Sequence, residues 1–134
     1  MITLDTSGVY ALSDRRDAHH GRAAQVLKSD RGPYLVPAAT LGELGYLLET
    51  RLGFDATIGF LRDLASGDFS LDCGERDFER IQELITRYKD LPLGLTDAAV
   101  IACAERNGGA VLTTDARHFG IVAREGTIRL LPAI

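Results

Sequence analysis

Short runs of apolar residues alternate along this chain with longer segments in which apolar residues recur every three or four positions. The short runs have the length of buried strands, and they cover residues 2–4, 34–36, 69–71, 110–113 and 128–131. The longer segments have the period of a helix that packs one face inward, and they cover residues 6–12, 18–29, 40–52, 55–66, 75–88 and 96–106. This succession predicts an α/β fold.

The predicted helices carry suitable capping residues at their starts. Thr6 or Ser7 is suited to cap the first helix, Asp55 the fourth and Thr96 the sixth. The leucines expected on one face of the third helix are Leu41, Leu44, Leu48 and Leu52. The residues expected to face inward from the fourth and fifth helices are Ile58, Leu61, Leu64, Ala65, Phe78, Ile81, Leu84 and Ile85.

Helices between successive strands predict crossover connections and therefore a parallel sheet. We expect a three-layer α/β/α, Rossmann-like fold with a central parallel sheet, formed by one domain over residues 1–134. No apolar stretch approaches the length of a membrane span, and the N-terminus lacks the pattern of a secretion signal. Cys73 and Cys103 have no ligand-like spacing and are expected to be buried thiols. A reducing cytoplasm fits these features best.

Four acidic residues stand where a hydrophobic element begins or ends. Asp5 and Asp115 follow predicted strands, whereas Glu43 and Asp97 fall in first helical turns. In a parallel α/β sheet, strand carboxyl ends and helix amino ends meet at one edge, so the four carboxylates are expected to converge. The net charge of −4 comes from 19 acidic and 15 basic side chains, so these four residues formally account for the whole imbalance.

Carboxylates held close together repel one another, so such a cluster either has raised pKa values or binds a compensating cation. Hard oxygen ligands favour Mg²⁺, with Mn²⁺ as a substitute, and such ions can activate water and neutralise a phosphodiester transition state. The sequence therefore predicts metal-dependent phosphodiester hydrolysis. The overall negative charge argues only against nonspecific coating of nucleic acid, which normally depends on Lys and Arg.

Each acid also has a purely structural interpretation. Asp97 can belong to a helix cap, Glu43 can be a first-turn acid favoured by the helix dipole, and Asp115 can be a turn residue. Asp5 is the exception, because a carboxylate directly after a short buried strand has no evident structural purpose. It is the order of the four acids together that favours the functional interpretation.

At these residues the chain resembles a known family. The segments Leu4-Asp5-Thr6-Ser7, Pro37 to Leu44, Leu95 to Ala98 and Leu112 to Phe119 are similar, in sequence and in order, to the motifs of PIN-domain ribonucleases. VapC-type toxins show the closest resemblance, which extends over essentially the whole chain. It implies an endoribonuclease that depends on Mg²⁺, forms a homodimer and is held inactive by a cognate VapB-type antitoxin.

The resemblance also implies roles for individual residues. Asp5 and Asp97 match the most regular metal ligands, Glu43 and Asp115 complete the acidic set, and Thr113 matches a supporting hydroxyl. Some relatives carry a further acid two residues beyond the fourth carboxylate, where this chain has Arg117. Arg117 is either a phosphate contact or a solvated surface residue, and the number of metal ions stays open.

The chain lacks residues that three other classes of protein need. A haloacid-dehalogenase-like phosphohydrolase needs a second Asp two residues after the first, where this chain has Ser7, and a response-regulator receiver needs a late Lys, yet none follows Lys89. A nucleotide-binding module needs a glycine-rich phosphate-binding loop, and the chain has neither the G-x-G-x-x-G nor the G-x-x-x-x-G-K-[ST] pattern. The main non-enzyme alternative is a catalytically silent PIN-like protein that only binds a partner.

Overall fold

The computed structural model describes residues 1–132, and its centre is a five-stranded sheet. The strand order is β3-β2-β1-β4-β5, and every neighbouring pair is parallel. The strands are β1 (Ile2–Leu4), β2 (Tyr34–Pro37), β3 (Ser70–Asp72), β4 (Ala110–Leu112) and β5 (Arg129–Leu131). All five strands predicted from the apolar runs are present, and the parallel direction is confirmed.

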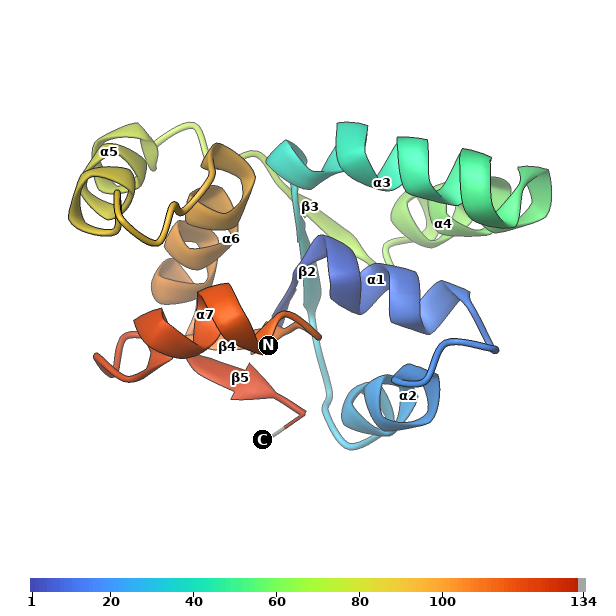
Figure 1. The fold of residues 1–134 in the computed structure, drawn as a ribbon. Coiled ribbons are helices and arrows are strands. Elements are labelled where there is room, and N and C mark those ends of the chain that lie inside the picture. Colours follow the sequence, from blue (N-terminus) through green and yellow to red (C-terminus); the bar gives the residue numbers. More distant parts are fainter. Residues whose placement is uncertain (133–134) are drawn as a thin grey trace.

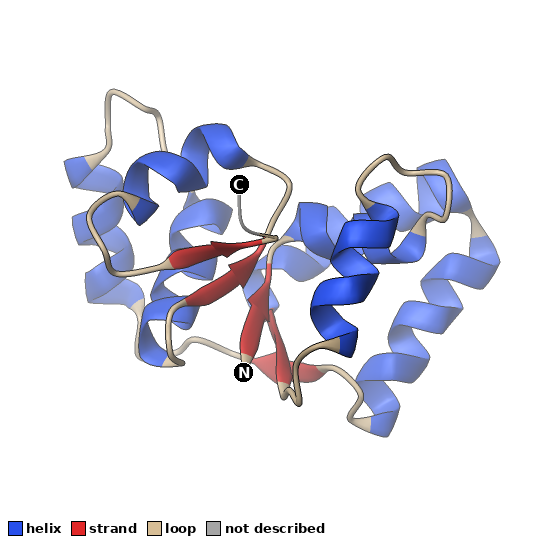
Figure 2. Ribbon diagram, turned by 90° about the horizontal axis from the view of Figure 1, so that it is seen from below, coloured by secondary structure: helices blue, strands red, loops and turns tan. Residues whose placement is uncertain are grey.

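Helices cover both faces of this sheet. The α-helices are α1 (Thr6–Ser13), α2 (His20–Lys28), α3 (Leu41–Leu47), α4 (Phe54–Ser66), α5 (Phe78–Arg87), α6 (Leu95–Arg106) and α7 (Ala116–Ala123). Figure 1 shows α1 to α4 on one side of the strands and α5 to α7 on the other. Figure 2, turned by 90°, shows the strands between the same two helical layers, which confirms the three-layer α/β/α fold.

Alternation along the strands creates a separate hydrophobic core on each face. Ile2, Leu4 and Leu112 are at most 1% exposed and belong to the core beneath α1 to α4. Val111 points to the opposite face, where it packs with residues of α5, α6 and α7. Because successive strand side chains point to opposite faces, a sheet covered on both sides needs apolar residues at almost every strand position. This requirement explains the short, continuous apolar runs.

Gly8 allows α1 to lie directly against the carboxyl end of β4. A Cβ atom at Gly8 would overlap the backbone oxygen of Leu112 and lie 3.0 Å from the carbonyl carbon. Backbone cannot move aside as a flexible side chain can, so only glycine fits there. This close approach brings the residue after β1 next to the residues after β4.

We expect Gly8→Ala to destabilise the protein by about 1–3 kcal/mol, because the added methyl group forces α1 away from β4. Gly59→Ala is the matched control, since Gly59 also lies within a helix but has no atom within 4 Å of a built Cβ. The control should leave stability unchanged or raise it by about 0.5–1 kcal/mol. Urea unfolding of both variants measures the difference. Equal midpoints would show that α1 is not tightly docked on β4.

Several predicted helix starts were wrong. The residues at the N-cap positions are Asp5 for α1, Gly53 for α4 and Gly94 for α6, in place of Thr6 or Ser7, Asp55 and Thr96. Glycine has no capping side chain, but its backbone freely adopts non-helical angles, and Gly53 has a φ of 93°. Side-chain capping preferences do not detect such glycine caps.

The third and fifth helices also differ from the prediction. The segment predicted over 40–52 is an α-helix only over Leu41–Leu47; a 3₁₀ turn (Ala38–Thr40) precedes it and a π-helical turn (Leu48–Leu52) follows. The fifth helix begins at Phe78 instead of 75. Residues 73–77 form a loop instead of the first turn of that helix, and Arg106 makes salt bridges with Asp72 and Asp77 on either side of it.

Four residues expected to be buried lie at the surface. Leu61 and Phe78 are 51% and 67% exposed, and Ala65 and Cys73 are also exposed. On α4 it is Phe60 that faces inward, where its ring lies 6.2 Å from that of Phe69. Within residues 1–132, no helix has the length and apolar character needed to cross a membrane.

Candidate active site

The strand order reverses at β1, whose carboxyl end lies beside that of β4. From β1 the chain moves outward to β2 and β3, and it later returns on the other side of β1 to form β4 and β5. Ligands of open α/β sheets bind where the strand order reverses in this way. Leu4 pairs with Leu112 in the ladder, so the next residues along the chain, Asp5 and Thr113, leave the sheet side by side.

Asp5 is the most buried of the four predicted acids. Asp5 is 4% exposed. Its oxygen Oδ2 accepts hydrogen bonds from Ser7 Oγ at 2.8 Å and from Thr113 Oγ1 at 2.9 Å. Burial raises the pKa of Asp5, and the charge of Asp115 acts in the same direction, while hydrogen bonds from the two hydroxyl groups and from the backbone N–H of Thr6 partly counter the rise. Asp5 is therefore an acid held in a fixed orientation where its charge is costly.

Asp97 lies in the first turn of α6 and is coupled to the other three acids. Burial is the main reason that its pKa is raised to about 6, and the charges of Asp5, Asp115 and Glu43 raise it further. The imidazole of His118 counters this effect. Because electrostatic interactions weaken with distance, this coupling places the four predicted acids around one part of the molecule.

Asp115 has both a structural role and a place beside the site. It is the N-cap residue of α7, where Oδ1 accepts the backbone N–H of His118 at 3.1 Å. Its other oxygen, Oδ2, lies 3.1 Å from His118 Nδ1. The structural interpretation of Asp115 as a turn residue is thus replaced by a helix cap. The raised pKa of Asp97 shows that the charge of Asp115 also acts on its neighbours.

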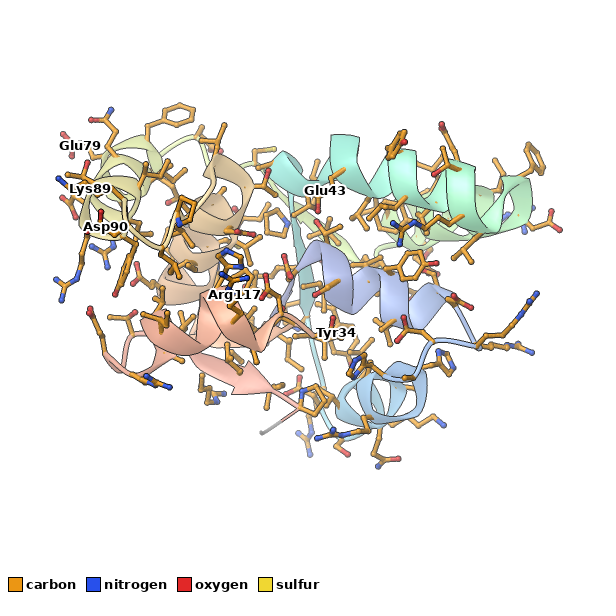
Figure 3. All side chains as sticks on the ribbon, viewed as in Figure 1. Tyr34, Glu43, Glu79, Lys89, Asp90 and Arg117 are labelled. Carbon is orange, nitrogen blue, oxygen red and sulfur yellow. The ribbon has the colours of Figure 1, made fainter. Side chains whose placement is uncertain are left out.

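Glu43 and Arg117 are more accessible than Asp5. Figure 3 shows Glu43 on α3 and Arg117 on α7, so the two residues come from opposite helical layers. Both side chains are exposed to solvent. Glu43 occupies the first turn of α3, as predicted, and it can reach a bound group without first displacing protein atoms.

The donor chemistry fits a hard divalent cation. Among residues 1–132, no three His, Cys, Asp or Glu side chains are close enough to hold an ion together. Mg²⁺ does not require such a cage, because it usually binds one or two carboxylates and keeps several waters. Burial first and the neighbouring carboxylates second raise the pKa of Asp97, and a bound cation would oppose both effects by favouring the charged form.

We expect Asp97→Asn to stabilise the metal-free protein at pH 7. A pKa of about 6 in the folded state, above the ordinary value of 3.8, means that folding favours the protonated form, so stability falls as pH rises from about 4 to 6. Asn removes this dependence. Thermal midpoints in EDTA should therefore be higher for Asp97→Asn at pH 7, with the gap closing near pH 4.

Asp55→Asn is the control, because Asp55 also lies in the first turn of a helix but is exposed on α4. It should show no such stabilisation. An Asp97→Asn protein that matched wild type at both pH values would mean that neither burial nor the neighbouring charges raise the pKa of Asp97 in the folded protein.

The fold and the acidic edge together define an α/β/α protein with a carboxylate site at the switch point of a parallel sheet. The PIN domain family model matches residues 2–125. The chain belongs to the PIN domain family, which confirms the resemblance drawn from its motifs.

Individual relatives agree with this assignment. Ribonuclease VapC26 of Mycobacterium tuberculosis is 35% identical over 120 residues, which cover 88% of this chain and 89% of the relative. Two solved structures share the fold at lower identity. VapC20 of Mycobacterium tuberculosis, described as a sarcin-ricin loop cleaving toxin, has a TM-score of 0.78 at 24% identity and covers 90% of this chain and 95% of its own. DNA-bound VapBC from Salmonella typhimurium has a TM-score of 0.64 at 22% identity, with coverage of 96% and 95%.

Two polar residues beside the acids received no role from the sequence. Ser7 hydrogen-bonds Asp5, and His118 contacts Asp115. From the sequence, Ser7 is a possible helix cap, a member of the first motif and a residue that argues against a haloacid-dehalogenase-like site, but not a partner of Asp5. The available signal was its position two residues after Asp5 at the start of a helix, where a hydroxyl can turn back to the carboxylate.

Proposed function

We propose that this chain is a metal-dependent endoribonuclease and the toxin of a type II toxin–antitoxin pair. The observation that carries the proposal is the group of acids around Asp97, whose pKa is raised by burial and by the charges of three other carboxylates. Membership of the PIN domain family and 35% identity to a protein named as a ribonuclease support the same activity. The proposed PIN domain comprises residues 1–134.

Asp5 and Asp97 are proposed to bind the metal directly, with Mg²⁺ as the natural ion and Mn²⁺ as a substitute. When bound, the ion supplies an activated water and neutralises charge on the phosphate. Glu43 and Asp115 bind it through water or position the attacking water. The buried, doubly hydrogen-bonded Asp5 keeps one ligand fixed, while exposed Glu43 faces incoming substrate. In the hydrolysis, the water oxygen would bond to phosphorus, the P–O bond to the leaving oxygen of the RNA backbone would break, and the two protons of the water would pass one to that oxygen and one to a nearby base or solvent.

The proposed partners are an RNA substrate, a cognate VapB-type antitoxin and a second copy of the chain, all in the cytoplasm. The relative described as VapBC supports an antitoxin. Large apolar side chains at the surface supply contact area for protein partners: Tyr46 is 68% exposed, Phe54 76% and Phe78 67%.

Cleavage of RNA by the purified protein tests the function. We expect labelled total RNA to be cut at defined positions with Mg²⁺ or Mn²⁺, to stay intact in EDTA, and to be protected when the antitoxin is added. Sequencing the new RNA ends then identifies the target class. A protein that binds RNA or the antitoxin but never cuts with either metal would be the catalytically silent PIN-like alternative, and the proposal would be wrong.

A further inference from the structure

The hydroxyl group of Ser7 connects three parts of the site that lie far apart in the sequence. Ser7 Oγ accepts the backbone N–H of Thr114 at 2.9 Å and donates to Asp5 Oδ2 at 2.8 Å. Thr114 is 107 positions away along the chain. The serine therefore links the start of α1 to the loop that follows β4.

Thr113 makes the same pair of contacts from the other side. Its Oγ1 accepts the backbone N–H of Asp115 at 2.9 Å and donates to Asp5 Oδ2 at 2.9 Å. A hydroxyl has one proton. An ionised carboxylate can only accept hydrogen bonds, so the protons of both hydroxyl groups must point to Asp5. Each hydroxyl oxygen then accepts a backbone N–H through one of its lone pairs. The 3.1 Å approach of Ser7 Oγ to Thr113 Oγ1 is then a contact between two polarised groups and not a competing hydrogen bond.

This arrangement distinguishes the two oxygens of Asp5. A carboxylate oxygen has about two lone-pair sites, and both sites of Oδ2 are taken by the hydroxyls of Ser7 and Thr113. The backbone N–H of Thr6 is the third hydrogen-bond partner of Asp5, and Oδ1, which accepts neither hydroxyl, is the oxygen with a lone pair for a cation. Losing the Ser7 hydroxyl would leave Oδ2 held by Thr113 alone, and the carboxylate would be oriented less firmly.

We propose that Ser7 is a positioning residue: it orients Asp5 so that Oδ1 stays available to a metal, and it holds the Thr114 backbone so that Asp115 stays beside the site. This inference rests on the proposed metal-dependent function. Partners that orient metal ligands from behind typically contribute 10–100-fold in metal affinity or activity. The Ser7 hydroxyl contacts Asp5, Thr113 and Thr114, so its proposed effect acts through Asp5 and must appear in how the metal binds.

Mn²⁺ binding to the RNA-free protein, followed by electron paramagnetic resonance, is the primary test. We expect Ser7→Ala to weaken Mn²⁺ binding by about 10-fold and to raise the Mg²⁺ concentration for half-maximal cleavage by a similar factor. Ser7→Thr retains the hydroxyl and should restore most of the affinity. Ser13→Ala is the matched control, because Ser13 is also a serine of α1 but donates only to the carbonyl of Val9 at 2.8 Å.

The outcomes separate this inference from the proposed function. If Ser7→Ala binds Mn²⁺ as tightly as Ser13→Ala and wild type, Ser7 is not a positioning residue, even when wild type cuts RNA. If affinity falls only in proportion to a lower thermal midpoint, and Ser7→Thr does not restore it, the role is merely structural and the inference is also wrong. If Ser7→Ala loses Mn²⁺ while folded but wild type cuts no RNA, the inference holds and the nuclease activity fails.

Discussion

Asp5→Asn should lower RNA cleavage by about 10²–10³-fold, the loss typical when a group that stabilises transition-state charge is removed. The substitution keeps the shape of the side chain but removes the negative charge that draws the cation. The amide oxygen of Asn can still accept the hydroxyl protons of Ser7 and Thr113, so the loss reports the missing charge. Single-turnover cleavage at saturating Mg²⁺ measures the effect.

The folded state of Asp5→Asn should be intact, because an uncharged group is easier to bury at a residue that is 4% exposed. Asp55→Asn, which alters an exposed acid on α4, is the control and should cleave at the wild-type rate. An Asp5→Asn protein within threefold of the control would remove Asp5 from the proposed machinery.

Phe119→Ala should destabilise the protein by about 3–5 kcal/mol. Phe119 is fully buried on α7 and packs in the core beneath α5 to α7 with Val111 and Val122. Removing the ring leaves a cavity that the neighbouring strand and helix can only partly fill. The free energy of unfolding in urea provides the measurement.

Ile121→Ala is the control for Phe119, since Ile121 lies on the same helix but is 39% exposed. It should cost much less, because most of its side chain already contacts water. Similar losses for the two variants would mean that α7 is not docked on the sheet as described.

The strands and the positions of the acids could be predicted because both follow from burial. A strand covered on two faces must be apolar throughout, so residues 2–4 and 110–113 were visible as runs. Once the sheet is parallel, residues that follow its strands share an edge, which placed Asp5 and Asp115 together. The order of the motifs then supplied the family. The joint binding of a metal by the four acids stays a prediction.

The seventh helix was missed because its signal is short. Over Ala116–Ala123 only Phe119 and Val122 are buried, and Gly120 interrupts the segment. Asp115 was interpreted as a possible turn residue, although it caps this helix through the backbone of His118. A capping Asp followed by two apolar residues three positions apart was the available indication, and one turn of spacing is weak evidence for a helix.

The role of Ser7 depends on strand register, which the sequence does not reveal. Its partners Thr113 and Thr114 lie more than 100 positions away, and they reach Ser7 only because Leu4 pairs with Leu112 and Gly8 allows close packing. A shift of the β1–β4 pairing by one residue would move these groups apart. Local sequence can place the Ser7 hydroxyl near Asp5, but it cannot predict that the residues following β4 lie beside them.

Anomalous diffraction from crystals soaked in Mn²⁺ tests the central claim most directly. The account predicts an Mn²⁺ peak at the carboxyl edge between β1 and β4, bound by Asp5 through Oδ1 and by Asp97, with Glu43 and Asp115 around it. A peak only elsewhere on the protein would contradict the account. So would the absence of a peak at this edge when protein dissolved from the same crystals cuts RNA.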